Sequence, residues 1–396
     1  MGRYRRGNMK GNNLSDVKKA NRQVVYECIW SHKAVTMTDI AYMTHLSRPT
    51  VTSLVQEMTA DNLVVKSGYG TSNGGRSPVL YHANAGAAYA MGIDLEFPKV
   101  RMAISNLECK NICFSVRVYP RDSDKDQMIR LLKQQIDDLI LDSGIDRSRL
   151  LGVGMGIPGV IDYKHNHSVL FERIEGWENV PIGDIIQRYV GKPVYICNDV
   201  NLLSWAERKA AHLEDVQNML YIVIRSGIGM AIWTDGSLMQ GEMGNSGRIG
   251  HMTVDKNGLE CKCGSRGCLG LYTSEKAMMR IYSELTGKEI KQAGDLVPLA
   301  ESGDKAALQV FETCGRYLGI GIVNVANLFD ISEVVVSASF DVSYILRNAQ
   351  YALDVRKMNT IRREVKIREG LLAESGFGLG GCLLVLDKEH MSLLEG

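Results

Sequence analysis

Three of the nine cysteines lie within eight residues, at Cys261, Cys263 and Cys268, and His251 precedes them with nine residues between. Structural zinc sites take four tetrahedral ligands from thiolate sulfur and imidazole nitrogen. Two glycines inside the cluster permit the tight turns that would direct the sulfurs to one centre. The alternative is a set of buried free thiols beside a core histidine, because free cysteine is often buried. The C-x-C-x4-C spacing favours zinc held by these four residues.

The length of 396 residues predicts two or three domains. A hydrophobic content of 45% with 23% charged residues is typical of a globular protein in water. No apolar run reaches the roughly 18 residues that would span a bilayer, so the expected location is the cytoplasm of a bacterium and no membrane partner is expected. Without a signal peptide the thiols should stay reduced, which argues against disulfides.

The charge is unevenly distributed along the chain. Residues 1–82 hold 11 Lys and Arg against 5 Asp and Glu, whereas the remaining residues hold 35 against 40. A basic amino-terminal part on an acidic body indicates a polyanionic partner at that end. Residues 1–13 carry four basic residues without an apolar period, which predicts a flexible basic arm; a tail that only aids solubility is the alternative.

Residues 14–86 have the pattern of a winged helix-turn-helix domain. An apolar stripe from Leu14 predicts a first helix, and Thr38 is expected to cap a short second helix at 39–43. Ser47 is a good N-cap for a third helix, in which Pro49 is tolerated in the first turn. Two β-like segments, at 63–66 and 79–81, then predict a hairpin wing.

The polar face of the third helix and the wing predict DNA contacts, with base edges read by the helix and phosphates held elsewhere. The expected DNA-binding residues are Ser47, Arg48, Thr50, Thr52, Ser53 and Arg76. The alternative is a small helical domain whose hairpin docks on the body. The basic balance favours double-stranded DNA.

Residues 87–396 alternate between β-like and helical segments. The first β-like set is 88–94, 99–105, 112–119, 150–155 and 194–197, with a helix at 125–142; the second set is 221–224, 230–234 and 333–336, with helices from Thr273 onward. Two successive strand-rich units predict a duplicated α/β body with a cleft between two lobes. Ligands of such folds lie at strand ends and domain interfaces.

Several motifs in this body resemble the ROK family, which joins bacterial sugar kinases of actin-like fold to NagC/XylR-type transcriptional repressors. The motifs are Gly152-Val-Gly-Met-Gly-Ile-Pro-Gly159, Asn198-Asp199, Gly227-Ile-Gly229, Gly250-His251 with the cysteine cluster, and, near the amino terminus, Ser47-Arg48-Pro-Thr-Val-Thr and Gly74-Gly75-Arg76-Ser-Pro78. The similarity runs from about residue 14 to the end. It implies an actin-like, two-lobed body and zinc at the four ligands named above.

The resemblance also assigns the position of the family's catalytic base to Asp199, although an Asn-Asp pair is common in turns at strand ends. Family kinases hold phosphate with an Asp-x-Gly-Gly-Thr turn, where this chain has Asp94-Leu95-Glu96-Phe97-Pro98-Lys99. Phosphate loops need glycines for close backbone approach, and proline has no N–H to donate. Family kinases also have a second nucleotide-binding turn, a Gly-Gly pair later in the chain. This chain has Ser337-Ala338-Ser339 at that position. No phosphoryl transfer is therefore expected.

The resemblance further predicts an effector site at Asn198, Asp199, Arg248 and His251. Family sugar sites carry a glutamate where this chain has Arg248, and another where it has Gly270. A guanidinium accepts no hydroxyl proton and favours carboxylate or phosphate, so an acidic or phosphorylated sugar derivative is one interpretation. Loss of ligand binding is another, and pairing of Arg248 with a nearby acid such as Glu242 is a third.

Together these features predict a transcriptional regulator, acting as a repressor of a carbohydrate-related operon. A dimer or tetramer is expected on a palindromic operator, since two-fold half-sites match two-fold proteins. The alternatives are a sugar kinase with an added DNA-binding domain and a body that serves only for docking and dimerisation.

Overall fold

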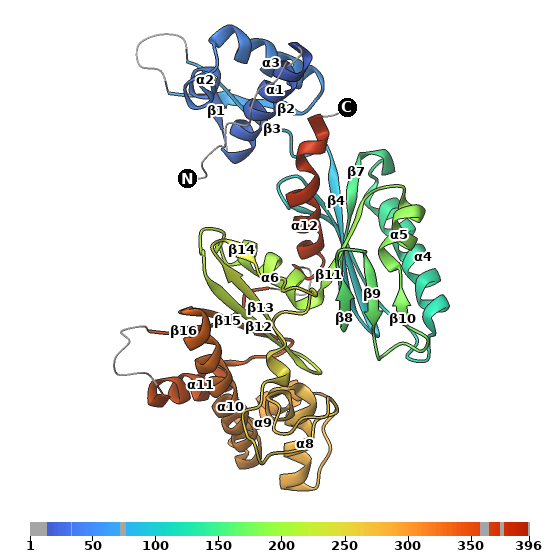
Figure 1. The fold of residues 1–396 in the computed structure, drawn as a ribbon, viewed down its shortest axis with the longest axis vertical. Coiled ribbons are helices and arrows are strands. Elements are labelled where there is room, and N and C mark those ends of the chain that lie inside the picture. The colour runs from blue at the N-terminus through green and yellow to red at the C-terminus, as the bar shows by residue number, and fades with distance from the viewer. Residues whose placement is uncertain (1–13, 33, 72–76, 357–363, 373–375, 395–396) are drawn as a thin grey trace.

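We describe a computed structural model of the chain, which covers residues 14–32, 34–71, 77–356, 364–372 and 376–394. Three parts follow one another from top to bottom in Figure 1: an amino-terminal head, a first lobe and a second lobe. The predicted arm at 1–13 and the predicted wing tip with Arg76 lie outside the described residues. None of the described helices has both the length and the hydropathy needed to cross a bilayer.

The head combines three helices with a small antiparallel sheet of order β1-β3-β2. Its elements are α1 (Leu14–Ser31), β1 (Val35–Thr36), α2 (Met37–Thr44), α3 (Arg48–Ala60), β2 (Val64–Tyr69) and β3 (Val79–Ala83). Ser47 caps α3, and its hydroxyl accepts the N–H of Thr50 at 3.3 Å, as predicted. One face of α3 buries Val51, Leu54, Val55 and Met58.

The predicted start of the second helix is wrong. The helix begins at Met37, and its cap is Thr36 rather than Thr38. The Thr36 hydroxyl accepts the N–H of Asp39 at 3.1 Å, and the Asp39 carboxylate accepts the N–H of Thr36 at 3.0 Å. This reciprocal capping box satisfies two backbone donors that a cap at Thr38 would leave without partners.

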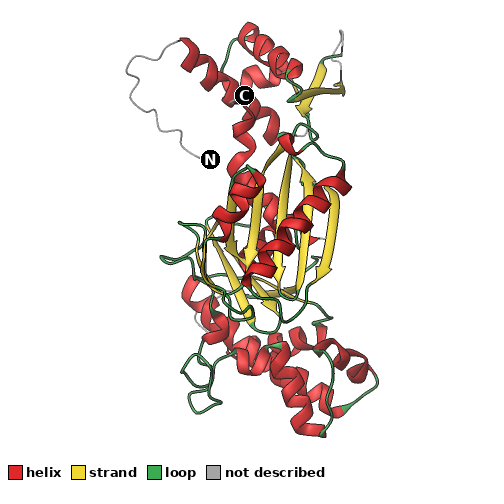
Figure 2. Ribbon diagram, turned by 90° about the vertical axis from the view of Figure 1, so that its right-hand side faces the viewer, coloured by secondary structure: helices red, strands yellow, loops and turns green. Residues whose placement is uncertain are grey.

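The first lobe contains a five-stranded sheet of order β11-β7-β4-β5-β6. Its elements are β4 (Tyr89–Glu96), β5 (Lys99–Asn106), β6 (Asn111–Val118), α4 (Lys125–Ser143), η1 (Arg147–Arg149), β7 (Leu150–Ile157), α5 (Ile182–Val190) and β11 (Val194–Asn198), with a side sheet of β8 (Val160–Asp162), β9 (His167–Leu170) and β10 (Glu178–Val180). Apolar residues of the strands, α4 and α5 form one buried core. Figure 2 shows helices lying across the face of this sheet.

The second lobe repeats the same plan, with sheet order β16-β15-β12-β13-β14. Its elements are α6 (Asp199–Ala210), β12 (Met219–Ile224), β13 (Ile228–Thr234), β14 (Ser237–Leu238), η2 (Ile249–His251), α7 (Gly270–Thr273), α8 (Glu275–Thr286), η3 (Ala293–Asp295), α9 (Leu296–Glu301), α10 (Lys305–Phe329), β15 (Glu333–Ala338), α11 (Ser343–Arg356) and β16 (Lys366–Glu369). In both sheets an antiparallel meander is followed by two parallel strands. The predicted duplicated α/β body is therefore confirmed.

The carboxyl-terminal helix α12 (Leu379–Glu389) returns to the first lobe and reaches the head through η5 (His390–Leu394). It packs so closely on β4 that a Cβ atom on Gly92 would lie 1.8 Å from the carbonyl oxygen of Gly378. At its far end Leu394 is buried in the core of the head, and His390 stacks on Trp30 with ring centroids 5.0 Å apart. Residues 390–394 thus join the head to the body.

Candidate functional site

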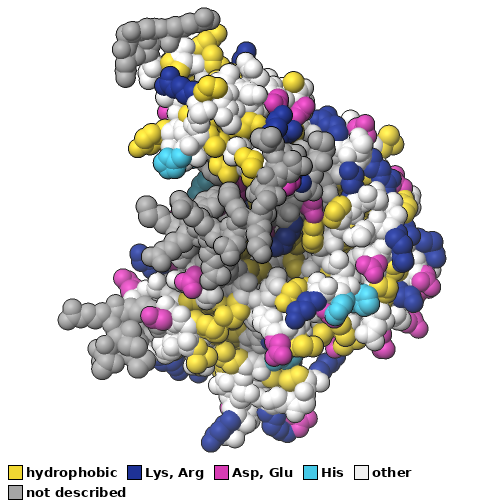
Figure 3. Space-filling model, turned by 45° about the horizontal axis from the view of Figure 1, so that its top comes forward, with side chains coloured by type: hydrophobic (Ala, Val, Ile, Leu, Met, Phe, Trp, Pro, Cys, Tyr) yellow, Lys and Arg dark blue, Asp and Glu magenta, His cyan; other side chains and the backbone are white. Residues whose placement is uncertain are grey.

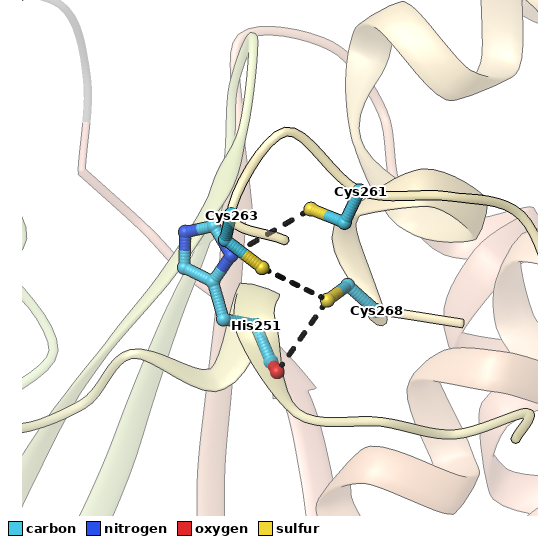
Figure 4. A group of neighbouring side chains, drawn as sticks. All are labelled: His251, Cys261, Cys263 and Cys268. Carbon is cyan, nitrogen blue, oxygen red and sulfur yellow. Dashed lines mark hydrogen bonds between the residues drawn. The ribbon is translucent and has the colours of Figure 1, made fainter. Parts of the chain in front are cut away.

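The four predicted metal ligands lie together in one loop of the second lobe (Figure 4). Their ligand atoms are all within 4.8 Å of one another, with His251 Nδ1 3.8 Å from Cys261 Sγ and Cys263 Sγ 3.6 Å from Cys268 Sγ. Zinc bonds of about 2.0–2.3 Å in a tetrahedron place neighbouring ligand atoms roughly 3.5–4 Å apart. One nitrogen and three sulfurs at this spacing can hold a metal ion.

Tight turns bring the cysteines together, as expected from the glycines. Gly264 and Gly267 both have left-handed backbone angles, with φ of +89° and +63°. A Cβ atom on Gly267 would lie 1.6 Å from the carbonyl oxygen of Asp255, so only glycine fits there. Burial and the neighbouring sulfurs raise the pKa of the Cys268 thiol to about 12, because three thiolates cannot share this space without a cation.

A cavity of about 210 Å³ lies between the lobes beside this loop. Asn198, Asp199, Arg248 and His251, the predicted effector-binding residues, all line it. Asn198 caps α6 by accepting the N–H of Val200 at 3.2 Å, so that Asp199 begins the helix at the end of β11. The structure therefore brings the predicted effector-binding residues to one site, where the histidine of the metal cluster forms part of the wall.

Arg248 lines the cavity and hydrogen-bonds to uncharged oxygen atoms of the protein. Its Nη2 donates to the carbonyl oxygen of Gly159 and to Asn245 Oδ1, each at 2.6 Å, rather than to Glu242. Burial lowers the pKa of Arg248, and the charge of Asp199 opposes that shift. The structure therefore does not support the interpretation that Arg248 serves to pair with Glu242.

A second arginine, Arg225, joins the two lobes through a buried charge network that we did not predict. It follows β12 of the second lobe and lies 3.4 Å from Asp94, 3.5 Å from Glu96 and 3.3 Å from Asp199, which all belong to the first lobe or the start of α6. Arg101 adds contacts of 2.9 Å to Asp94 and 2.7 Å to Glu96. The network places three carboxylates around two guanidinium groups.

The pKa values in this network follow from burial and from the arginines. Burial raises the pKa of Asp94 despite Arg225 and Arg101, and it raises the pKa of Asp199 to about 6 despite Arg225. The two arginines overcome burial at Glu96 and hold its pKa below the usual range. At Arg225 the three carboxylates overcome burial and raise its pKa, so this guanidinium stays charged.

The segment that replaces the kinase phosphate turn is a tight connection between β4 and β5. Phe97 is buried, and Pro98 follows directly before β5 begins at Lys99. Arg173 of the first lobe donates to the carbonyl oxygen of Phe97 at 3.2 Å and to the hydroxyl of Ser226 in the second lobe. Through these contacts Arg173 connects the two lobes at the edge of the 210 Å³ cavity.

Beyond Arg225 a second cavity of about 400 Å³ is lined by Ser337, Ala338 and Ser339. The guanidinium groups of Arg101 and Arg225 stack over the ring of Phe377, 4.5 and 5.2 Å from its centroid. Long separation in sequence hid this arrangement, since Arg225 and Asp94 are 131 positions apart. The sequence offered one indication of this network, which is the position of Arg225 directly before the Ser226-Gly227 turn.

The predicted DNA-binding residues differ in exposure. Ser47, Arg48 and Ser53 are exposed on the head, whereas Thr50 and Thr52 are half-buried. The Thr52 hydroxyl donates to Met37 Sδ at 3.6 Å and thus contacts the head's own helix α2. Figure 3 shows acidic and basic side chains interspersed over the visible face of the body.

Comparison with known proteins gives relatives of two kinds. The xylose repressor of Bacillus spizizenii is 31% identical over 353 residues, which cover 89% of this chain and 88% of the relative. The xylose repressor of Bacillus subtilis is 29% identical and covers 94% of this chain and 96% of its own. A glucokinase of Halalkalibacterium halodurans is 27% identical over 62% of this chain and 78% of its own length.

Solved structures show the same division. A ROK family transcriptional regulator, a homologue of the Escherichia coli MLC protein, superposes with a TM-score of 0.80 at 22% identity, over 96% of this chain and 98% of its own. A ROK hexokinase of Thermus thermophilus reaches a TM-score of 0.63 at 24% identity, over 78% of this chain and 100% of its own. The family model described as "ROK family" matches residues 90–355, so this chain belongs to the ROK family.

Proposed function

We propose that this protein is a DNA-binding transcriptional regulator that represses a carbohydrate-related operon in the bacterial cytoplasm. The observation that carries the proposal is the extent of similarity: relatives named xylose repressor match 89–94% of this chain and 88–96% of their own length. The matched kinase relative and kinase structure account for only 62% and 78% of the chain.

The head is the proposed DNA-binding unit. We assign residues 14–86 to a winged helix-turn-helix domain, 1–13 to a basic arm, and 87–396 to the effector-binding and oligomerisation body. The turn between α2 and α3, with Ser47 and Arg48 exposed at the start of α3, supports this assignment, because the second helix of such a motif supplies side chains to the major groove. A homodimer or tetramer on a palindromic operator follows from the symmetry of half-sites.

A sugar kinase with an added head is the weaker alternative. The connection at Phe97 and Pro98 offers no glycine backbone to phosphate oxygens, and Arg225 with its three carboxylates bridges the lobes between the two cavities. Phosphoryl transfer needs a nucleotide cradle and metal ions on the phosphates. Measurable phosphorylation of a sugar with Mg-ATP would contradict the regulator proposal.

We assign zinc to His251, Cys261, Cys263 and Cys268. The donor set of one imidazole and three thiols, with ligand atoms within 4.8 Å of one another, supports zinc over harder cations, which prefer oxygen. When bound, the ion would fix the loop that carries His251 into the wall of the cavity. Its role is thus structural support for the effector site.

The cavity between the lobes is the proposed effector site, and its ligand is a sugar or an acidic sugar derivative. Asp199 can accept hydroxyl protons, and Arg248 can donate to carboxylate or phosphate. Binding shifts a regulator only through a difference in affinity between two states, typically worth ~1–3 kcal/mol. A body without effector control would instead show operator binding that no sugar alters.

A path from this cavity to the head exists in the packing. Asp199 begins α6, and Gly380 of α12 lies so close to α6 that a Cβ atom there would be 2.0 Å from the carbonyl oxygen of Leu202. The same carboxyl-terminal segment ends with Leu394 in the core of the head. We propose this segment as the route by which effector binding in the cavity would reach the head.

Changing Arg248 to glutamate tests the effector class. We expect the wild-type protein to bind an acidic sugar more tightly than its neutral parent, and Arg248→Glu to reverse that order by at least about tenfold, because a carboxylate repels an anion and accepts hydroxyl protons. Isothermal calorimetry with paired sugars, such as glucose and glucose 6-phosphate, measures both constants. Arg316→Glu, on the outer face of α10, is the control. If wild type and Arg248→Glu showed the same ratio of affinities for the acidic and the neutral sugar, the assignment of Arg248 as the contact of an acidic effector would be contradicted.

Selection of bound DNA tests the proposed function itself. The full chain is incubated with a random duplex library, and retained DNA is amplified and sequenced with and without candidate sugars. We expect an inverted repeat to be enriched, because two heads would each contact one half-site. Enrichment should change when the effector is present. Failure to enrich any sequence would overturn the proposal.

A further inference from the structure

The outer face of α3 carries four residues at the spacing used by DNA-reading helices. Pro49, Ser53 and Gln56 are exposed and Thr52 is half-buried, while the opposite face enters the core of the head. These positions are i, i+3, i+4 and i+7, which lie on one side of a helix. Homeodomain recognition helices read the major groove with the same spacing. Gln56 was not among the residues that the sequence suggested.

The other polar side chains at the start of this face are already engaged. The Ser53 hydroxyl donates to Glu57 at 3.2 Å, and the Thr52 hydroxyl donates to the sulfur of Met37. The hydroxyls of Ser47 and Thr50 lie 2.8 Å apart and bond each other. Gln56 is exposed, and its amide takes part in none of these bonds.

The acids near the end of α3 are neutralised from behind by α1. Lys18 pairs with Glu57 at 2.9 Å, and Arg22 pairs with Asp61 at 2.5 Å. The hydrogen bond from Lys18 lowers the pKa of Glu57, which therefore stays an ion-pair partner of α1. The two described acids near the end of α3 are thus paired with cations, which limits their repulsion of phosphates. The face around Gln56 is chemically suited to approach the duplex.

A glutamine amide matches adenine in the major groove. Its N–H donates to N7 and its carbonyl accepts from the N6 amino group, a bidentate pair that no other base offers in the same geometry. Resting on the proposed function, we infer that Gln56 reads an adenine at one position in each operator half-site. Arg48, at the first position of the helix, is a contact of another kind, because a guanidinium prefers guanine or phosphate.

The inference predicts a change in base preference at one position only. Random-library selection is performed with the full-length wild type, Gln56→Ala and Gln56→Glu. We expect Gln56→Ala to keep the rest of the enriched sequence and lose the adenine, and Gln56→Glu to prefer cytosine there, because a carboxylate accepts from the cytosine N4 amino group. Alanine and glutamate are both good helix formers, so the fold of α3 should be retained.

Direct binding measurements give the size of the effect. For wild type, replacing the selected A·T pair by G·C should weaken binding by about 5- to 150-fold, the usual range for one bidentate contact. Gln56→Ala should bind the two duplexes within about twofold of each other. Gln309→Ala, an exposed glutamine on α10 of the second lobe, is the matched control and should retain the wild-type discrimination.

Two outcomes separate this inference from the proposed function. A wild-type protein that enriches no sequence would overturn both. The assignment of Gln56 alone would be overturned by either of two results. In the first, Gln56→Ala enriches the same sequence as wild type; in the second, Gln56→Ala binds every duplex more weakly by the same factor. The second pattern would mark Gln56 as a phosphate contact, since such contacts carry no base preference.

Discussion

Under the proposed zinc assignment, Cys263→Ser should abolish zinc binding and destabilise the second lobe, which is the largest effect that we expect from a single exposed residue. Cys263 is exposed, so the substitution removes a ligand without leaving a cavity in the core. Structural zinc contributes binding free energy of about 10–16 kcal/mol that is also folding free energy. Mutation of a residue that only hydrogen-bonds to a metal ligand typically weakens metal affinity by ~10- to 100-fold, and loss of one of the four ligands themselves should weaken it further. Metal content after dialysis measures this directly.

The same variant should respond less to the effector, because His251 is both a metal ligand and part of the cavity wall. The head should keep its helical signal and its own unfolding transition, since its core contains no residue of the metal loop. Cys113→Ser, a half-buried cysteine of β6, is the matched control. A Cys263→Ser protein that retains one zinc per chain at wild-type stability would contradict the assignment.

Arg225→Met should destabilise the junction of the two lobes by about 3–5 kcal/mol, the usual result of removing one partner from a buried ion pair. Asp94 is fully buried, and Asp199 nearly so; this guanidinium contacts both carboxylates and shares Asp94 with Arg101. Urea unfolding at pH 8 measures the loss. Arg280→Met removes an exposed pair with Glu284, 2.7 Å apart on α8, and should cost less than about 1 kcal/mol.

The loss caused by Arg225→Met should depend on pH. Burial raises the pKa of Asp94 and raises that of Asp199 to about 6, so the folded state takes up protons more readily than the unfolded state. Protonation therefore favours the folded state as the pH falls from 8 through 6. Without Arg225, which lowers both pKa values, this gain should be larger. The deficit at pH 5.5 should be smaller than at pH 8, and an equal deficit at both would refute the network.

Features that depend on residues close together in the sequence could be predicted from local sequence patterns. The capped α3 follows from Ser47 and its apolar spacing, and the metal cluster follows from three cysteines within eight residues. The first-lobe meander follows from short β-like segments joined by tight connections. Each of these depends on contacts within about twenty positions, where spacing along the chain limits the possible geometry.

Features that depend on distant contacts were missed. Arg225 meets Asp94 across 131 positions, and no periodicity in either segment indicates that they pair. Helix α12 packs closely on the first-lobe sheet because glycines face each other there, Gly92 against Gly378 and Gly154 against Gly381. Gln56 lies among polar residues that look alike in sequence, and only the bonds of Ser53 and Thr52 distinguish it.

We propose that the ROK body controls DNA binding by the head, and operator affinity as a function of salt tests this proposal. Fluorescence anisotropy of the full-length protein on its selected duplex and on a scrambled duplex should give log K falling linearly with log salt, by about 0.9 per phosphate contact. At physiological salt the selected duplex should bind at least about 10³-fold more tightly. Equal affinity for both duplexes, or no binding to either at low salt, would contradict sequence-specific DNA binding by this protein.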